Sequence, residues 1–313
     1  MKTTLLSLTI VTVFLISVAF QTNKTLDQII TTALVEKHIT ILASDEMEGR
    51  KAGTPGIEKA AVYIENEFEK LELKPFQSSE DYRQRFTKKN LELFNVIGVL
   101  EGRSKKDEFV VVSAHYDHLG IIKGNPKDSI ANGADDDASG VAAVLSLARY
   151  WKKRGDNERS IIFVAFTAEE KGLWGSNYFG KQVNPESIIA GINIEMIGKD
   201  SKFGSKTAWL TGFYRSDFGE IIQKNIKDTE YKLYPDPYPN FGLFYRSDNA
   251  SLARLGIPAH TFSTDPIDTD KFYHTVDDEI ETLNIETVAT TIRAIALGTE
   301  SIIMGVDTPT RIK

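Results

Sequence analysis

Apolar residues recur at intervals of three and four along several segments of the chain, which is the pattern of amphipathic helices. This pattern predicts helices over residues 26–43, 57–73, 140–150 and 285–304. The segment between the first two, residues 44–56, is polar and contains three glycines. It therefore separates two predicted helices.

Other segments are short, apolar and rich in Val, Ile and Phe, as strands buried on both faces of a sheet are. They cover residues 93–100, 109–114, 161–167 and 188–194, with a shorter run at 257–262. Because these segments alternate with helices, the sequence predicts an α/β fold with a mostly parallel sheet wrapped by helices. Residues 231–245 contain three prolines and several aromatic residues, so we expect an irregular loop beside the functional site.

The start of the chain has the features of a secretory signal peptide. Lys2 precedes an apolar stretch, residues 5–20, that is short for a membrane span, and Ser17 and Ala19 are small residues at the spacing of a cleavage site. We therefore predict a signal peptide over residues 1–20, with an uncleaved membrane anchor as the alternative. The mature protein is expected to be secreted or periplasmic, without stable membrane insertion.

The rest of the chain shows no internal repeat, Gly/Ser linker or change of composition, so we expect a single domain over residues 25–313. The chain has 37 Lys and Arg against 44 Asp and Glu and no block of like charge, which argues against binding to nucleic acid. It has no Cys, which excludes disulfides, thiolate zinc sites and a cysteine nucleophile. Any metal must be held by His, Asp and Glu.

Polar residues directly follow the predicted strands. The strand ending at residue 114 is followed by His115, Tyr116, Asp117 and His118, and a later loop contains the triplet Asp135, Asp136 and Asp137; Glu169, Glu170 and Glu195 follow the next two strands, and His274 comes late in the chain. Ligands gather at the carboxyl ends of parallel strands. So many carboxylates in one cleft need a cation, and imidazole with carboxylate suits a catalytic zinc site.

Each of these features alone has a structural interpretation. His115 with Asp117 is the pattern of a turn pair, the Asp triplet that of a helix start capped by Asp137, and Glu169 with Glu170 that of an exposed helix N-terminus. Their joint position after successive strands favours a site. There, the Asp117 carboxylate would orient the His115 ring. We interpret His38 and His260 as structural and leave His118 open.

The strings around these residues resemble a known family. His115-Tyr-Asp-His-Leu-Gly, Gly133-Ala-Asp-Asp-Asp-Ala-Ser-Gly, Thr167-Ala-Glu-Glu-Lys-Gly and Tyr273-His-Thr are similar, in this order, to motifs of the cocatalytic di-zinc aminopeptidases, which include secreted bacterial leucine-type enzymes. The resemblance implies a three-layer α/β/α fold with a mixed, mostly parallel sheet, of the phosphorylase/hydrolase type. It extends over nearly the whole mature chain.

The resemblance also implies roles for individual residues. Two Zn²⁺ ions would share Asp136; His115 and Glu195 would complete one site, and Glu170 and His274 the other. Glu169 matches the general base that takes a proton from the metal-bridging water and passes it to the leaving amine, and Tyr273 or Tyr245 would donate to the oxyanion. The chain departs from the family at Glu195, where most members have Asp, and at Asn249, where many have His.

The predicted function is that of a zinc-dependent exopeptidase, an aminopeptidase that hydrolyses N-terminal residues of peptide substrates. Two alternatives share the fold: a glutaminyl-peptide cyclotransferase and a noncatalytic binding protein. The Asp triplet favours the peptidase over the cyclotransferase, and a candidate residue at every metal position and at the base argues against the binding protein. A serine hydrolase is disfavoured because the chain contains no Gly-x-Ser-x-Gly string.

Overall fold

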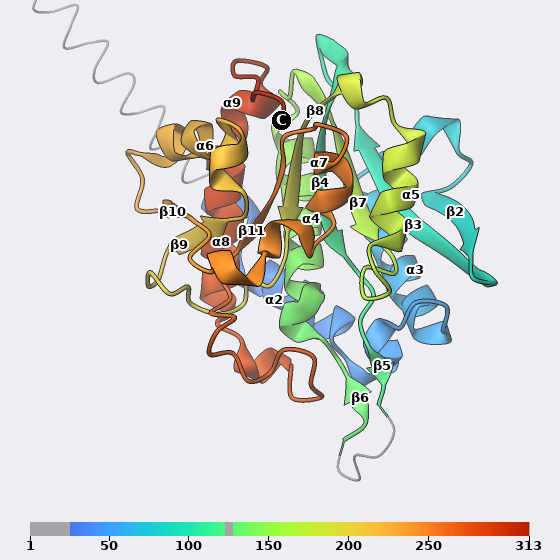
Figure 1. Ribbon diagram of the computed structural model, residues 1–313. Helices are drawn as coiled ribbons and strands as arrows, with labels where there is room; N and C mark the ends of the chain where they lie inside the picture. The colour runs from blue at the N-terminus through green and yellow to red at the C-terminus, as the bar shows by residue number, and fades with distance from the viewer. Residues whose placement is uncertain (1–25, 123–127, 313) are drawn as a thin grey trace, which may run out of the picture.

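The structure is a computed structural model that describes residues 26–122 and 128–312 (Figure 1). The predicted signal peptide, residues 1–20, lies outside the described residues. None of the described helices combines the length and apolarity needed to cross a membrane.

A nine-stranded sheet forms the centre of the structure, in the order β1-β3-β7-β4-β8-β11-β9-β10, with β2 paired to β3. The strands β7, β4, β8 and β11 run parallel to one another, and β3 runs antiparallel to β7. The predicted mixed, mostly parallel sheet is therefore confirmed in its central part. The strand bounds are β1 Lys74–Pro75, β2 Arg83–Lys88, β3 Leu91–Leu100, β4 Lys105–His115, β7 Arg159–Phe166, β8 Ile188–Ile194, β9 Thr207–Leu210, β10 Lys232–Pro235 and β11 Ala259–Ser263.

Helices cover both faces of this sheet (Figure 1). One face packs against α2 Thr32–Leu42, α3 Pro55–Lys70, α4 Gly140–Arg154, α6 Phe218–Ile226 and α8 Ile285–Gly298, and the other against α5 Trp174–Gln182 and α7 Asn249–Ala253. Along β4, Val110 and Val112 belong to the apolar core of the first face and Val111 to that of the second. This alternation of side chains produces the three layers of an α/β/α fold.

The predicted helices are present, with different ends. The first is interrupted: residues 26–29 are helical, and α2 begins at Thr32 after a break at Ile30 and Thr31. Thr31 caps α2, since its Oγ1 accepts a hydrogen bond from the amide of Leu34 at 3.1 Å. The last predicted helix is divided into α8 and α9 Glu300–Ile303, with Thr299 between them. Hydrophobic periodicity continues across Thr299, so the sequence pattern could not reveal this break.

The prediction of an irregular loop over residues 231–245 is wrong for its first part. Residues Lys232–Pro235 form β10, which pairs in parallel with β9 at the edge of the sheet. Proline is tolerated in an outer strand because no neighbour requires its missing amide. The remainder contains the 3₁₀ turns Pro239–Phe241 and Leu243–Tyr245, and Leu243 reaches the site described below.

Two short antiparallel strands, β5 Gly120–Ile121 and β6 Ile130–Ala131, lie between β4 and α4. They bring the segment after His118 back to the edge of the sheet where β4 ends, and residues Ala134–Ser139 then lead into α4. The sheet therefore carries its polar loops at one edge.

Candidate metal centre

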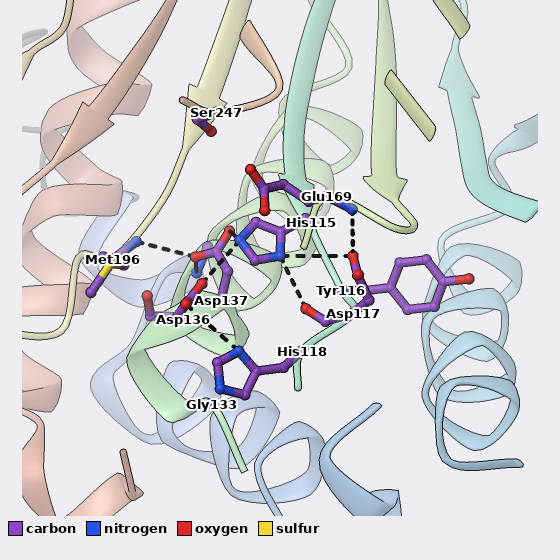
Figure 2. Close-up of polar contacts among 12 residues, drawn as sticks. His115, Tyr116, Asp117, His118, Gly133, Asp136, Asp137, Glu169, Met196 and Ser247 are labelled. Carbon is purple, nitrogen blue, oxygen red and sulfur yellow. Dashed lines mark hydrogen bonds and ion pairs between the residues drawn. The ribbon is translucent and has the colours of Figure 1, made fainter. Parts of the chain in front are cut away.

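Three neighbouring strands end at the site. β4 ends at His115, which lies in register with Phe166 at the end of β7, and Glu169 and Glu170 follow three and four residues later. On the other side of β4, β8 ends at Ile194, directly before Glu195. Parallel pairing thus brings side chains from three separate segments together, as the sequence predicted (Figure 2).

Asp136 joins this edge from the loop before α4. His115 Nε2 lies 3.0 Å from Asp136 Oδ1. Ligand atoms of His115, Asp136 and Glu195 all lie within 4.8 Å of one another, with Glu195 partly buried and the other two buried. This is the first of two groups that meet at Asp136.

The second group contains Glu170 and His274. His274 Nε2 lies 3.1 Å from Glu170 Oε2 and 3.3 Å from Asp136 Oδ2. The five residues predicted as metal ligands therefore converge on the two oxygens of Asp136. They come from five separate segments of the chain.

His118, which the sequence left open, lies in this second group. Its Nδ1 is 3.1 Å from Glu170 Oε1 and 3.6 Å from Asp136 Oδ2, and its ring is fully buried. Its atoms, with those of Asp136 and Glu170, also lie within 4.8 Å of one another. The His-x-x-His spacing in the loop after β4 is the signal that could have identified it.

Asp117 supports the site differently from the prediction. The His115 ring is oriented by the main-chain oxygen of Asp117, 3.0 Å from Nδ1, while the nearest carboxylate oxygen of Asp117 is 3.9 Å away. That carboxylate instead accepts a hydrogen bond from the amide of Glu169 at 3.0 Å. The predicted carboxylate–imidazole contact is wrong, and the side chain positions the start of the Glu169 loop (Figure 2).

The other two residues of the Asp triplet have structural partners. Asp137 Oδ1 accepts hydrogen bonds from the amides of Gly140 and Met196, and so joins the start of α4 to the end of β8. Asp135 Oδ1 accepts from the amide of Gly198 at 2.7 Å, and its Oδ2 is 3.1 Å from Lys199 Nζ. Asp136 is the member of the triplet that contacts both His115 and His274, while Asp137 Oδ2 lies 4.0 Å from His115 Nε2.

Two distant residues that the sequence did not identify hold this loop. The Asp278 carboxylate accepts hydrogen bonds from the amides of Asp135 and Asp136, 3.0 Å each for the shorter contacts. The guanidinium of Arg50 is fully buried and donates to four main-chain oxygens, those of Leu42, Tyr116, Asn132 and Gly133. Arg50 thereby joins the segment after His115 to the segment before Asp136.

The ionisable groups of the site shift one another's pKa. Burial opposes ionisation of Asp136, but the close contacts with the imidazoles of His115 and His274 outweigh it and hold the pKa of Asp136 well below its usual range. Burial also lowers the pKa of His274, yet hydrogen bonds to Asp136 and Glu170 raise it to about 10. Without another cation, protons on the imidazoles therefore balance the carboxylates.

Burial opposes the ionisation of Glu169 and Glu195. It raises the pKa of Glu195 to about 7, against the opposing effect of His115, and raises the pKa of Glu169 well above its usual range. A raised pKa favours a carboxylate that accepts and holds a proton, which is what a general base requires.

The donor atoms fit zinc. Ligand atoms of a tetrahedral zinc ion with bonds of about 2.0–2.1 Å lie about 3.3 Å apart, and the three contacts of His115 and His274 with Asp136 and Glu170 measure 3.0, 3.1 and 3.3 Å. His115 Nε2, Glu170 Oε1 and Glu195 Oε2 are buried and have no hydrogen-bond partner among the described residues. One divalent ion would satisfy the atoms of His115 and Glu195, and a second would satisfy that of Glu170.

A pocket adjoins these ligands, and Glu169, Glu195, Tyr273 and His274 line one part of it. Tyr273 is thus placed beside the reacting groups. Tyr245, the alternative donor, is 47% exposed and contacts Phe244 and Arg215, outside the lining of this pocket. The geometry favours Tyr273 of the two.

His38 and His260 lie elsewhere. His38 Nδ1 is 2.6 Å from the hydroxyl of Tyr63, and His260 stacks on Phe218 and contacts Ser216. Burial lowers the pKa of both to about 4. They are buried neutral groups of the core.

Comparison with known proteins gives three results. The sequence model of peptidase family M28 matches residues 95–298 of this chain. Over 205 residues the chain is 30% identical to leucine aminopeptidase 1 of Pyrenophora tritici-repentis, which covers 61% of this chain and 51% of that protein, so the chain spans about half the length of the curated relatives it matches.

Solved structures show the same fold. Legionella pneumophila LapA aminopeptidase superposes with a TM-score of 0.74 at 21% identity, covering 92% of this chain and 76% of that one. Porphyromonas gingivalis glutaminyl cyclase superposes with a TM-score of 0.67 at 16% identity, covering 87% of this chain and 99% of that one. Since both a peptidase and a cyclase share it, the fold alone does not distinguish the two activities.

Proposed function

Because this chain belongs to peptidase family M28, as its motifs predicted, we propose that it is a zinc-dependent aminopeptidase that removes N-terminal residues from peptides. The observation that carries the proposal is the pair of ligand groups that share Asp136, with Glu169 lining the same pocket. Two ligand groups in a water-accessible pocket suit metal-assisted hydrolysis.

In this proposal two Zn²⁺ ions are bound, one by His115, Asp136 and Glu195 and the other by Asp136, Glu170 and His274. When bound there, zinc supplies a Lewis acid that polarises the scissile carbonyl and acidifies the attacking water. Glu195, where the family usually has Asp, directly follows β8 and brings its longer side chain within 4.8 Å of ligand atoms of His115 and Asp136.

The residues around the ions perform the proton transfers. The Glu169 carboxylate takes the proton of the attacking water and delivers it to the amine that leaves, and its raised pKa favours holding that proton between the two steps. The Tyr273 hydroxyl donates to the oxygen of the former carbonyl as negative charge develops there. Both side chains line the pocket beside the metal ligands.

An amino-terminal cleavage is favoured over a carboxyl-terminal one by the charge of the pocket. Asp136, Glu169 and Glu195 line it on the metal side. These carboxylates attract the ammonium of a peptide N-terminus and repel a C-terminal carboxylate. The name of the relative in Pyrenophora agrees with this direction.

The test is a panel of aminoacyl 4-nitroanilides, with N-acetylated and glutaminyl substrates alongside, assayed together with metal analysis. We expect release of nitroaniline from free-amine substrates, two zinc ions per chain and loss of activity in a chelator that zinc restores. Chelator-insensitive activity without bound metal would contradict the proposal, and ring closure of the glutaminyl substrate without hydrolysis would instead identify a cyclotransferase.

We further propose that residues 1–20 direct the protein out of the cytoplasm and that residues 25–313 fold as one domain. The apolar stretch after Lys2 supports the first, and the continuous nine-stranded sheet supports the second. N-terminal sequencing of exported protein should begin near Gln21, and thermal unfolding of the processed chain should show a single transition. A first residue of Met1 in the exported protein would contradict the signal peptide.

A further inference from the structure

The pocket beside the metal ligands is also lined by apolar residues and by an acidic residue that is not one of those ligands. Beyond Glu169 and Glu195, its wall is formed by Met196, Trp209, Leu243 and Ile267, and Asp265 also lines it. The pocket therefore combines an apolar wall with one carboxyl group that belongs to neither metal-ligand group. The mechanism above does not use this carboxyl group.

Asp265 is buried and lacks a hydrogen-bond donor. The residue is 1% exposed, and neither carboxylate oxygen has a hydrogen-bond partner among the described residues. Its position is fixed from the main chain, since its amide donates to the main-chain oxygen of Met196 and to Ser263 Oγ. A buried carboxylate without a donor is unfavourable unless a ligand supplies one.

The nearest cation is already shared. Lys199 Nζ lies 3.6 Å from Asp265 Oδ1, but it is closer to Asp270, at 2.9 Å, and to Asp135, at 3.1 Å. One ammonium therefore faces three carboxyl groups. Burial raises the pKa of Asp265 to about 8, the charges of Asp135 and Asp270 act in the same direction, and Lys199 opposes them.

The remaining cation of the pocket is Arg246, which lies on its lining but is exposed to solvent. Solvent screens an exposed charge, so Arg246 leaves the buried carboxyl group of Asp265 without compensation. A second positive charge can thus be accommodated beside Asp265.

We propose that this pocket receives the side chain of the substrate's first residue and that Asp265 makes the enzyme prefer lysine or arginine there. The proposal rests on the aminopeptidase function proposed above. The methylene stem of such a side chain packs on Met196, Leu243 and Ile267, and its cationic end meets Asp265. A leucine side chain would bury the same wall but leave the carboxyl group without a partner.

The experiment compares kcat/KM for the 4-nitroanilides of lysine, arginine, leucine and norleucine, the last of which resembles lysine without its ammonium. We expect the wild-type enzyme to cleave the lysine and arginine substrates roughly tenfold or more faster than the norleucine substrate, the range that a hydrogen bond to a charged group provides. In Asp265→Asn this ratio should fall roughly tenfold or more, while leucine cleavage and zinc content are kept.

Asp268→Asn is the matched control. It makes the same change three residues away at a side chain that is 39% exposed and is 3.8 Å from Lys202. We expect it to keep the wild-type selectivity. Free lysine should also inhibit leucine cleavage more strongly than free norleucine does, and Asp265→Asn should remove that difference.

The outcomes separate the two proposals. Efficient release from leucine and norleucine without preference for lysine or arginine overturns this inference and leaves the aminopeptidase function in place, as does an Asp265→Asn variant that slows all four substrates equally. Release from none of the substrates overturns both. If the variant does not fold, the wild-type ratios and the inhibition by free amino acids decide alone.

Discussion

The two sides of the site, on either side of Asp136, are built from different parts of the fold. His115 ends the central strand β4 and is 1% exposed, and Glu195 directly follows the neighbouring strand β8. On the other side, Glu170 and His274 lie in loops, and the side chain of His274 is 37% exposed. One side is therefore carried by the sheet and shielded, whereas solvent reaches the other directly.

The contacts that position the ligand side chains also differ between the two sides. The His115 ring is oriented by the main chain two residues away, and the amide of Glu195 donates to the main-chain oxygen of Phe262 in the neighbouring strand β11. Glu170 and His274 depend on each other and on His118. A ligand pair on strand ends is therefore positioned by strand pairing, whereas a pair on loops is positioned by its own mutual contacts. We expect the zinc ion on the loop side to exchange more readily.

The largest effect is expected where the two sides meet. Asp136→Asn should reduce bound zinc from two ions per chain to none and activity to the detection limit, because Asp136 contributes an oxygen to each side. Metal analysis after gel filtration measures this. Asp268→Asn serves as the control for a change of charge, and retention of two tightly bound ions in Asp136→Asn would show that the sides do not share this residue.

A smaller effect should separate the base from the ligand in the Glu169–Glu170 pair. Glu169→Gln should keep its zinc and lower kcat at least roughly a hundredfold, the contribution typical of a general base. Glu170→Gln should instead lose the ion on the loop side, because Glu170 contacts His274 and His118. Zinc content and kcat of the two variants, measured together, would show an interchange of roles if the pattern were reversed.

On the sheet side, Glu195 provides a stoichiometric test. Glu195→Ala should bind one zinc ion tightly instead of two, since Asp136, Glu170 and His274 still serve the other ion. Glu195→Asp should restore the lost ion at least in part, because it keeps the carboxylate and changes only its reach. Two undiminished tight sites in a zinc titration of Glu195→Ala would show that another group holds that ion.

The smallest effect concerns pH in the chelated protein. His274 has a pKa of about 10 in the folded chain against an ordinary value of 6.5, so its stabilising contribution is complete below about pH 6.5 and is lost as pH rises towards 10. The difference in unfolding free energy between wild type and His274→Gln should therefore shrink over that interval. Its size is modest because solvent screens a side chain this exposed.

Denaturant unfolding of both proteins in chelator, at several pH values between 6 and 10, measures this difference. His38→Gln is the control, because burial lowers the pKa of His38 to about 4 and leaves it neutral throughout the interval. A wild-type advantage over His274→Gln that grows with pH would mean that His274 carries no proton between Asp136 and Glu170.

Much of the site was predictable because it follows strand ends. Glu195 directly follows an apolar run, and Glu169 comes three residues after β7, so the rule that ligands collect at carboxyl ends of parallel strands located them. The ligand roles expected of Glu195 and Glu170 came from motif resemblance. The position of His274 beside them was predicted from the same resemblance, since no strand ends directly before it in the sequence.

Other features required the folded chain. The Asp278 carboxylate accepts a hydrogen bond from the amide of Asp135, which is 143 residues away in the sequence, and Arg50 donates to Gly133, which is 83 residues away. No local sequence pattern therefore predicts either contact. The orientation of His115 by a main-chain oxygen instead of the Asp117 carboxylate depends on how the loop turns after β4. The break between α8 and α9 left the hydrophobic period unchanged.

The sequence by itself determined the layered α/β architecture, the family and the set of candidate metal ligands, because hydrophobic period and motif order are local properties of the chain. Tertiary structure alone decided which oxygens and nitrogens face one another, how much solvent reaches each side of Asp136, and that Asp265 lines the pocket with its oxygens lacking a hydrogen-bond donor among the described residues. The physical reason is that burial and charge compensation arise from the packing of distant segments, and a side chain's partners in space are not written in its neighbours along the chain.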